Sequence, residues 1–389
     1  MDSEVPYSSY QDQIFIDGLE GRKPGLAIAY RKLKEQARAK LSEAAYGYLA
    51  GGAGSEDTMR ANLQAFRRWR IVPRMLRDVA QRDLSVEVLG KRLPAPLILA
   101  PIGVQGIIHS DAELATARAA ASLNLLSILS TASSRTLEEV AQATGDAPRW
   151  FQLYWPRHPE LTSSFLKRAE AAGYEAVVVT LDTRFLGFRE RDLQQAYNPF
   201  LIGQGIANYF SDPVFRSELQ TPPEEDPQTA IRHFAAHFSD PSLTWDDLGS
   251  LPDQTRLPIL LKGILHPEDA RKALDCGMQG LIVSNHGGRQ VDGAIAALDA
   301  LPQVVEAVDD RCLILFDSGI RGGADIFKAL ALGARAVLIG RPYVWGLAVD
   351  GEAGVREVMM RLLADFDLAM ALSGYSSLGE LSPSALQKL

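Results

Sequence analysis

The chain has 389 residues, of which 47% are hydrophobic, 23% charged and 8% aromatic, and these values are close to the average for globular proteins. This composition excludes collagen, coiled-coil and disordered chains. The 40 basic and 48 acidic residues give a net charge of −8, which argues against a nucleic-acid partner.

The same sequence predicts neither a membrane partner nor an export signal. The first fifteen residues carry Asp2, Glu4 and Asp12 and contain no apolar run, so we expect no signal peptide. The apolar stretch 93–108 is interrupted by prolines and is too short to span a bilayer. Two cysteines are too few for a disulfide framework or a thiolate metal site. We therefore expect a cytoplasmic protein without a metal site.

The N-terminal part, about 1–90, is expected to form a helical cap on the domain. Apolar and basic residues alternate at helical spacing over 27–48, and Gly51, Gly52 and Gly54 end that pattern. Near the C-terminus, an apolar stripe over 355–372 predicts a helix that packs on the outside of the domain.

Between these ends, eight short apolar runs alternate with helical patterns, most of them about 20 to 30 residues apart. Runs that are apolar on both faces are typical of buried parallel strands. Eight strand–helix units predict a single α/β domain over 1–389 with the fold of a (β/α)8 TIM barrel. The expected strands are 97–100, 126–130, 150–154, 176–181, 259–262, 281–284, 312–316 and 336–339. The expected helices between them are 111–122, 136–144, 159–173, 267–277, 299–308 and 323–333.

A long insertion, about 191–242, follows the fourth strand. Long segments on such barrels usually belong to the loops above the active face, and the run from Pro222 to Asp226 is typical of flexible chain. We expect this insertion to form a partly mobile lid.

Polar residues follow the predicted strands, where barrel enzymes place their catalytic groups. The glycine-rich turns 317–321 and 340–341 contain Arg321 and Arg341, and together they favour a phosphate site over two solvated turns. Lys262 would emerge at the barrel mouth, either to form a Schiff base or to neutralise charge on a cofactor. His286 and Arg289 offer a proton acceptor beside a carboxylate clamp, with Asp182 placed to orient the histidine.

Together, these motifs resemble those of one known family. The sequence is similar to the FMN-dependent α-hydroxy acid oxidising family from about residue 30 to residue 381. Within the family, the insertion most resembles the lactate 2-monooxygenases. The motifs that carry the likeness are 48–53 (YLAGGA), 100–104 (APIGV), 151–154 (FQLY), 181–183 (LDT), 198–201 (NPFL), 207–209 (ANY), 261–263 (LKG), 284–289 (SNHGGR), 317–321 (DSGIR) and 340–342 (GRP).

The resemblance implies an FMN enzyme in which His286, oriented by Asp182, abstracts a proton. It implies that Arg289 and Arg189 hold the substrate carboxylate, that Tyr48 and Tyr154 bond to the substrate as part of the catalytic set, and that Lys262 stabilises the reduced flavin. It implies a homo-oligomer built on a tetramer. The cofactor residues implied are Ala100, Pro101, Ile102, Ser130, Gln152, Thr180, Lys262, Ser284, Asp317, Gly319, Arg321, Gly340 and Arg341.

The resemblance implies that Gly103 influences the reaction outcome, because related oxidases have alanine there and monooxygenases have glycine. A smaller residue could keep the keto acid near the flavin, so that L-lactate and O2 give acetate, CO2 and water. The alternatives are an oxidase that releases pyruvate and H2O2, and a catalytically silent FMN-binding protein. Gly103 could also simply be required by its turn. Ala132, Arg184 and Phe185 depart from the family pattern beside the expected pocket and leave the preferred 2-hydroxy acid open.

Overall fold

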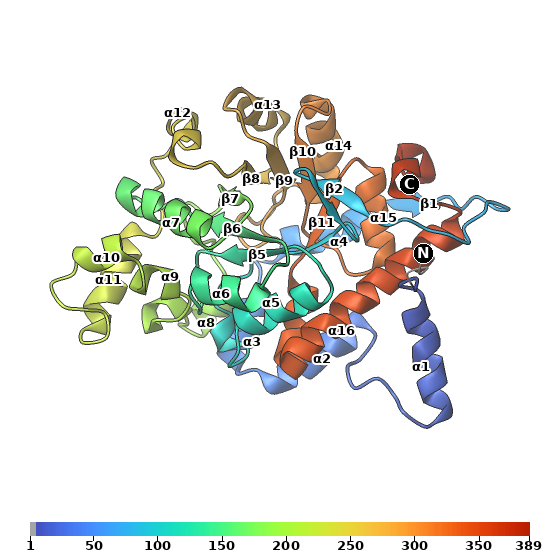
Figure 1. The fold of residues 1–389 in the computed structure, drawn as a ribbon, viewed down its shortest axis with the longest axis horizontal. Helices are drawn as coiled ribbons and strands as arrows, with labels where there is room; N and C mark the ends of the chain where they lie inside the picture. Colours follow the sequence, from blue (N-terminus) through green and yellow to red (C-terminus); the bar gives the residue numbers. More distant parts are fainter. Residues whose placement is uncertain (1–4) are drawn as a thin grey trace.

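A closed barrel of eight parallel strands lies at the centre of the computed structural model, which describes residues 5–389 (Figure 1). Around the barrel the strands follow the order β10-β11-β4-β5-β6-β7-β8-β9. The predicted (β/α)8 fold is confirmed, and each predicted strand overlaps an observed one. The barrel strands are β4 (Leu97–Leu99), β5 (Ser127–Ser130), β6 (Arg149–Leu153), β7 (Val177–Thr180), β8 (Ile259–Ile264), β9 (Gly280–Val283), β10 (Leu313–Phe316) and β11 (Ala336–Ile339).

The barrel interior is filled by side chains rather than by solvent, because alternate residues of each strand point inward. The antiparallel hairpin of β2 (Val86–Val88) and β3 (Lys91–Leu93) contributes Val86 and Val88 to the same buried cluster. It therefore closes the end of the barrel at which the strands begin, and the opposite end is left for the site. The strand side chains in this cluster include Ile98, Ile128, Trp150, Val178, Leu260, Ile282, Leu315 and Leu338.

Helices cover the outside of the barrel, and several begin at residues suited to a helix start. Thr136 and Glu139 form a reciprocal capping box at the start of α6, and proline occupies the first turn of α7 and of α13. The last helix is broken at Gly351, where φ is +55°. The covering helices are α5 (Glu113–Ser122), α6 (Leu137–Thr144), α7 (Pro159–Ala171), α13 (Pro267–Asp275), α14 (Ala297–Val308), α15 (Gly323–Ala331) and α16 (Arg341–Ser373).

The N-terminal segment differs from the expectation of one helix over 27–48. Leu41 adopts an extended conformation, and Ser42 accepts a hydrogen bond from the Ala45 amide, so the chain forms two helices there. The single-helix prediction was wrong because helical spacing alone does not reveal a break of two residues, Leu41 and Ser42. The segment contains α1 (Ser9–Leu19), α2 (Tyr30–Lys40), α3 (Glu43–Ala50) and α4 (Asp57–Arg67). After it, β1 (Trp69–Ile71) pairs antiparallel with β12 (Leu386–Lys388).

The insertion after β7 folds around aromatic side chains. Tyr209 is fully buried, and its ring centroid lies 4.7 Å from that of Phe234 and 5.0 Å from that of Phe165 on α7. The helices of the insertion extend to one side of the barrel (Figure 1). They are α8 (Glu190–Gln194), η2 (Pro199–Ile202), α9 (Ala207–Phe210), α10 (Pro213–Ser217), α11 (Pro227–His237) and α12 (Trp245–Leu248). Shorter turns elsewhere are η1 (Gln105–Ile107), η3 (Pro252–Gln254), η4 (Leu378–Glu380) and η5 (Pro383–Ala385).

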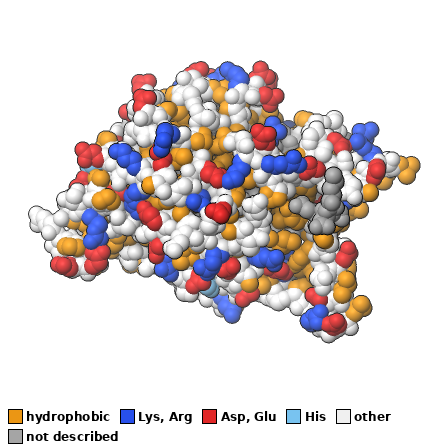
Figure 2. All heavy atoms as spheres, in the orientation of Figure 1, with side chains coloured by type: hydrophobic (Ala, Val, Ile, Leu, Met, Phe, Trp, Pro, Cys, Tyr) orange, Lys and Arg blue, Asp and Glu red, His pale blue; other side chains and the backbone are white. Residues whose placement is uncertain are grey.

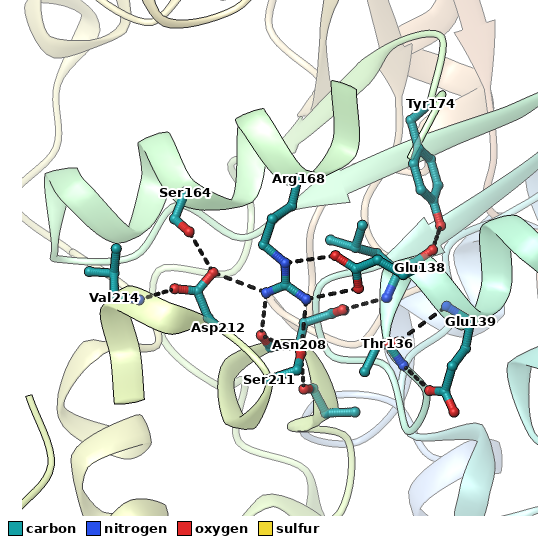
Figure 3. A network of polar contacts seen from close by, with 12 residues as sticks. Thr136, Glu138, Glu139, Ser164, Arg168, Tyr174, Asn208, Ser211, Asp212 and Val214 are labelled. Carbon is teal, nitrogen blue, oxygen red and sulfur yellow. Dashed lines mark hydrogen bonds and ion pairs between the residues drawn. The ribbon is translucent and has the colours of Figure 1, made fainter. Parts of the chain in front are cut away.

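Arg168 of α7 fastens this insertion to the barrel helices (Figure 3). Its guanidinium bonds to both carboxylate oxygens of Glu138 on α6, to the carbonyl oxygen of Asn208 and to Oδ2 of Asp212, at 2.8 to 3.0 Å. Asp212 is fully buried and also caps α10. The first half of the insertion is therefore held by a charged network in addition to its aromatic core.

The molecular surface shows no strong segregation of charge on the face drawn in Figure 2, where basic and acidic side chains are interspersed. None of the helices within residues 5–389 has the length and apolar character that a bilayer span requires.

Candidate active site

A cavity of about 1100 Å³, counting the part open to solvent, lies at the end of the barrel where the strands finish. It brings together most of the residues expected to form the site. Those that line it are Tyr48, Ala100, Pro101, Ile102, Gly103, Tyr154, Arg189, Lys262, His286, Arg289, Asp317, Gly319, Arg321, Gly340 and Arg341. Asp182, Ser130, Gln152, Thr180 and Ser284 do not line this cavity and are described below by the neighbours that they contact.

His286 follows β9, and its ring lies against the carboxylate of Asp182, which follows β7. Its Nδ1 lies 2.8 Å from Oδ1 of Asp182 and 3.3 Å from the hydroxyl of Thr183. Burial lowers the pKa of His286, and Lys262 and Arg189 act in the same direction, while Asp182 opposes them. Burial would raise the pKa of Asp182, but His286 and Lys262 hold it below its usual range. The arrangement is a neutral imidazole, oriented by a carboxylate, whose other nitrogen is available to accept a proton.

The backbone at His286 is held in an unusual conformation. Its φ is +57°, and Gly287 and Gly288 follow with φ of +65° and +75°. A left-handed conformation is unfavourable for a residue with a side chain, so neighbouring contacts must enforce it. The amide of His286 donates to Oγ of Ser284, and the amide of Gly287 donates to Oγ of Ser318, each at 3.0 Å. Ser284 therefore shapes the turn that presents the imidazole.

Lys262 extends from β8 into the barrel mouth and is almost completely buried. Its Nζ lies 3.1 Å from Oδ2 of Asp317 and donates to Oγ of Ser284 at 2.9 Å. Burial would lower the pKa of Lys262, but Asp317 and Asp182 raise it above its usual value. The site thus contains a permanent buried ammonium group. A Schiff base requires a neutral amine, so charge neutralisation is the better account of this residue.

Two arginines enclose the ring of Tyr48. Arg289 lies 5.0 Å and Arg189 lies 6.0 Å from the ring centroid. Arg289 donates to the carbonyl oxygens of Tyr48 and Gly51, at 2.6 and 2.8 Å, and Arg189 donates to the carbonyl oxygen of Arg289 at 3.1 Å. Burial and the charge of Arg189 lower the pKa of Arg289 to about 10. Two buried cations this close together favour an anionic ligand between them.

Arg341 and Arg321 form a second cationic group beside the last two strand ends. Arg341 donates to the carbonyl oxygens of Leu49, Gly51 and Gly287, and burial together with Arg289 and Arg321 lowers its pKa to about 9. Arg321 stacks on the ring of Tyr30 at 4.6 Å, and its buried Nε has no hydrogen-bond partner among the described residues. A Cβ on Gly319, where φ is +104°, would lie 3.0 Å from the carbonyl oxygen of Asn62. Such a turn is suited to an anion that contacts backbone amides.

The ends of β5, β6 and β7 present buried polar groups. Oγ of Ser130 donates to Oε1 of Gln152 at 2.9 Å. Within residues 5–389, Nε2 of Gln152 and Oγ1 of Thr180 are buried without a hydrogen-bond partner. Buried polar atoms are normally satisfied, so these two atoms indicate a polar ligand edge at this position.

Gly103 and Ala132 face each other across one wall of the cavity. A Cβ added to Gly103 would lie 2.7 Å from the carbonyl oxygen and 3.0 Å from the Cβ of Ala132. The amide of Val104 donates to that same carbonyl oxygen at 2.8 Å. The close approach of the two backbones is therefore a sufficient reason for glycine at 103. Of the other departures from the family pattern, Arg184 and Phe185 lie outside the cavity lining, and the side chain of Phe185 is exposed.

Several residues of the site were not predicted from the sequence. Leu186, Phe200 and Phe238 line the cavity, and the last two belong to the insertion. The carbonyl oxygen of Gly51, which accepts from both Arg289 and Arg341, was also missed. Backbone acceptors and aromatic residues in a loop carry no sequence pattern that marks them as part of a site.

Comparison with known proteins identifies the family. The model of the family described as FMN-dependent dehydrogenase matches residues 37–388. The chain belongs to the FMN-dependent dehydrogenase family. An FMN-dependent alpha-hydroxy acid dehydrogenase of Penicillium citrinum is 45% identical over 389 residues, with 99% of this chain and 97% of the relative covered.

Other similar proteins are named as oxidases of hydroxy acids. An L-lactate oxidase of Lysinibacillus sphaericus is 44% identical and covers 93% of both chains, and human 2-hydroxyacid oxidase 1 is 42% identical and covers 93% of this chain and 96% of the relative. A crystal structure of mandelate oxidase superposes with a TM-score of 0.81 at 38% identity, covering 93% of this chain and 98% of that one. The predicted FMN cofactor and 2-hydroxy acid oxidation are thereby confirmed.

The residues of this FMN-dependent dehydrogenase fit its cofactor. The orphaned polar atoms of Gln152 and Thr180 suit the polar edge of an isoalloxazine ring, and Lys262 supplies positive charge. Arg321 and Arg341, beside glycine-rich turns, suit a phosphate.

Proposed function

We propose that this chain oxidises small L-2-hydroxy acids, with L-lactate as the first candidate substrate. The observation that carries the proposal is the neutral, buried imidazole of His286, held by Asp182 in the same cavity as Arg289 and Arg189. A proton acceptor beside a carboxylate clamp matches the two polar ends of a 2-hydroxy acid. The catalytically silent alternative is disfavoured because packing alone gives no reason for these groups to converge.

Arg289 and Arg189 would bind the substrate carboxylate, and the hydroxyls of Tyr48 and Tyr154 would bond to the substrate. Burial raises the pKa of Tyr154, so its hydroxyl stays protonated and can donate. His286 would accept the proton of the substrate hydroxyl while the α-hydrogen leaves as a hydride. The positive imidazole formed in this step is stabilised by Asp182, 2.8 Å away.

FMN supplies the acceptor for the two electrons when it is bound. Ser130, Gln152 and Thr180 would bond to the ring, with Ala100, Pro101 and Ile102 beside it. Lys262, held by Ser284, would stabilise negative charge on the ring. Asp317 and Gly319 would contact the ribityl chain, and Arg321, Gly340 and Arg341 the phosphate.

The finer proposal is that the keto acid stays bound long enough to be decarboxylated. Oxidation of lactate passes two electrons to O2, and the hydrogen peroxide formed would react with the retained pyruvate to give acetate, CO2 and water. The support is the cover over the cavity, where Phe200 and Phe238 from the insertion lie with a ring-centroid distance of 5.3 Å. In this proposal the insertion is a lid that slows product release.

Release of pyruvate and H2O2 is the alternative outcome, and two observations favour it. Backbone packing against Ala132 is enough to account for Gly103, and the named relatives include L-lactate oxidases. Aerobic turnover of L-lactate without catalase separates the two. Acetate with little free peroxide supports decarboxylation, and equimolar pyruvate and peroxide contradict it.

We propose that the chain self-associates as a tetramer through exposed apolar side chains such as Phe185, Phe188 and Ile202. Light scattering on the FMN-loaded protein tests this, and a monomer at micromolar concentration would contradict it. Location in the cytoplasm stays a prediction.

A further inference from the structure

Two of the six histidines of the chain lie on the insertion, away from the proposed catalytic groups, and they face Glu218. His233 and His237 lie one turn apart on α11, and Glu218 directly follows α10. Glu218, His233 and His237 each bring one ligand atom to a group in which all three atoms lie within 4.8 Å of one another. We call these three residues the α10–α11 cluster.

His158, the residue that caps α7, contacts Glu218 of the α10–α11 cluster. Its Nδ1 accepts a hydrogen bond from the amide of Leu161, and its Nε2 lies 2.5 Å from Oε1 of Glu218. The other carboxylate oxygen of Glu218 lies 2.6 Å from Nε2 of His233. Glu218 thus connects a barrel helix to α11, with each of its oxygens directed at a different imidazole.

The α10–α11 cluster offers two imidazoles and one carboxylate, which is a donor set that binds metals. Nδ1 of His237 is buried and has no hydrogen-bond partner in the described part of the chain. Neutral imidazoles with one carboxylate are the ligands that Zn²⁺ prefers among protein oxygen and nitrogen donors.

The geometry points to a zinc site formed by Glu218, His233 and His237. The three ligands would leave a fourth position for water, and His158 would hold the second oxygen of the carboxylate, as neighbours of metal ligands commonly do. Donor atoms around tetrahedral Zn²⁺ lie about 3.3 Å apart. The separations of up to 4.8 Å would therefore shorten on binding, and the 2.6 Å contact between Glu218 and His233 would lengthen, both through side-chain rotation. The sequence signal for this site is the His-x-x-x-His spacing within 233–237, which places both imidazoles on one face of α11.

The position of the site gives it a structural role in the insertion. The first half of the insertion is already fastened by Arg168 and Asp212 (Figure 3). The α10–α11 cluster lies in the second half, and Phe238, the residue after His237, lines the active-site cavity and packs on Tyr154 with a ring-centroid distance of 5.2 Å. Bound Zn²⁺ would therefore hold α11 to α10 and fix the aromatic cover above the cavity.

The test uses untagged, FMN-loaded protein that has been treated with a chelator and dialysed. Titration with Zn²⁺, followed by calorimetry and by metal analysis after gel filtration, should give one bound ion per chain and a higher thermal midpoint. Hydrogen exchange should slow over 227–238. Mg²⁺ at the same concentration should produce neither effect, because it prefers all-oxygen sites.

Two variants and a matched control separate this site from adventitious binding. His233→Ala with His237→Ala should weaken Zn²⁺ binding by at least about tenfold, and Glu218→Gln, which keeps the side-chain shape, should also weaken it. His266→Asn removes a histidine outside the cluster and should bind Zn²⁺ like the parent chain. FMN absorbance and circular dichroism establish that each variant is folded. Failure of the parent chain to bind one Zn²⁺, or equal binding by the folded double variant, would overturn the proposal.

Discussion

Lys262 and Asp317 form a buried ion pair across the barrel mouth, with Nζ and Oδ2 3.1 Å apart and the hydroxyl of Ser284 as a further acceptor. The pair joins β8 to the end of β10, and Ser284 follows β9 between them. A charged group held this rigidly needs no reorganisation when negative charge develops nearby. The pair therefore holds a positive charge in a fixed position at the barrel mouth, as the proposed role of Lys262 requires.

Replacement of Lys262 by Met should lower the reduction potential of the bound FMN. The variant removes the positive charge that stabilises the reduced ring, and we expect a fall of at least about 30 mV, which corresponds to about 1.4 kcal/mol for a two-electron couple. Spectroelectrochemical titration measures this. Lys328→Met is the matched control, because Lys328 donates to the Phe66 carbonyl oxygen outside the cavity. An unchanged potential in the Lys262 variant would remove Lys262 from this role.

His286→Gln should give a folded, yellow protein that L-lactate reduces at least about 100-fold more slowly, because the proton acceptor is lost. Anaerobic stopped-flow absorbance measures the rate of flavin reduction. His109→Gln, a histidine outside the cavity lining, should be reduced at the normal rate. Near-normal reduction of the His286 variant would exclude this residue as the base.

The pH dependence of kcat/KM should report His286. Its pKa lies below the ordinary value of 6.5, so activity should be lost only when the pH falls below that value. Asp182→Asn removes the group that raises this pKa. In this variant, the acid limb of the kcat/KM profile should move to lower pH, and the maximal kcat/KM should fall. If the acid limb stays at the same pH, a group other than His286 is responsible for it.

Gly103→Ala should lower stability by about 1–3 kcal/mol, because the new methyl group meets the carbonyl oxygen of Ala132 at 2.7 Å. If product retention depends on this wall, the variant should also release more H2O2 per lactate oxidised. Gly18→Ala is the control, because a Cβ there meets nothing within 4 Å. Urea unfolding and a peroxide assay measure the two effects, and an unchanged peroxide yield would disconnect Gly103 from the reaction outcome.

Asp367→Asn should lower the free energy of unfolding at pH 7 by about 3 kcal/mol, because it leaves the mostly buried Arg82 without its carboxylate partner. Burial would raise the pKa of Asp367, but Arg82 and Ser8 hold it below the ordinary value of 3.8. The stabilisation is therefore present above about pH 4 and is lost as the pH falls through the folded-state pKa. The difference between parent and variant should shrink in acid. Asp17→Asn, at an exposed pair, should have a much smaller effect.

The order of strands and helices could be predicted because each unit carries a local pattern. Runs such as Val177–Thr180 and Ala336–Ile339 are apolar on both faces, and only a strand covered on both sides buries such a run. The barrel then requires that residues after the strands meet at one end, so His286, Lys262 and Arg341 could be assigned to one site without coordinates.

Other features depended on contacts between distant segments. The break at Leu41, the backbone acceptor at Gly51 and the aromatic cover from Phe200 and Phe238 arise from packing, which local patterns do not encode. The approach of Glu218 to two histidines is of the same kind.

The sequence alone determines that this protein is a barrel whose mouth carries cationic side chains and a histidine. The reason is that the spacing of hydrophobic residues, and the residues that follow each strand, can be read locally. Only the tertiary structure decided that Gly103 is closely packed against Ala132 and that the insertion covers the cavity. Those features depend on distances between residues far apart in the chain, and such distances are set by how the side chains between them fill space.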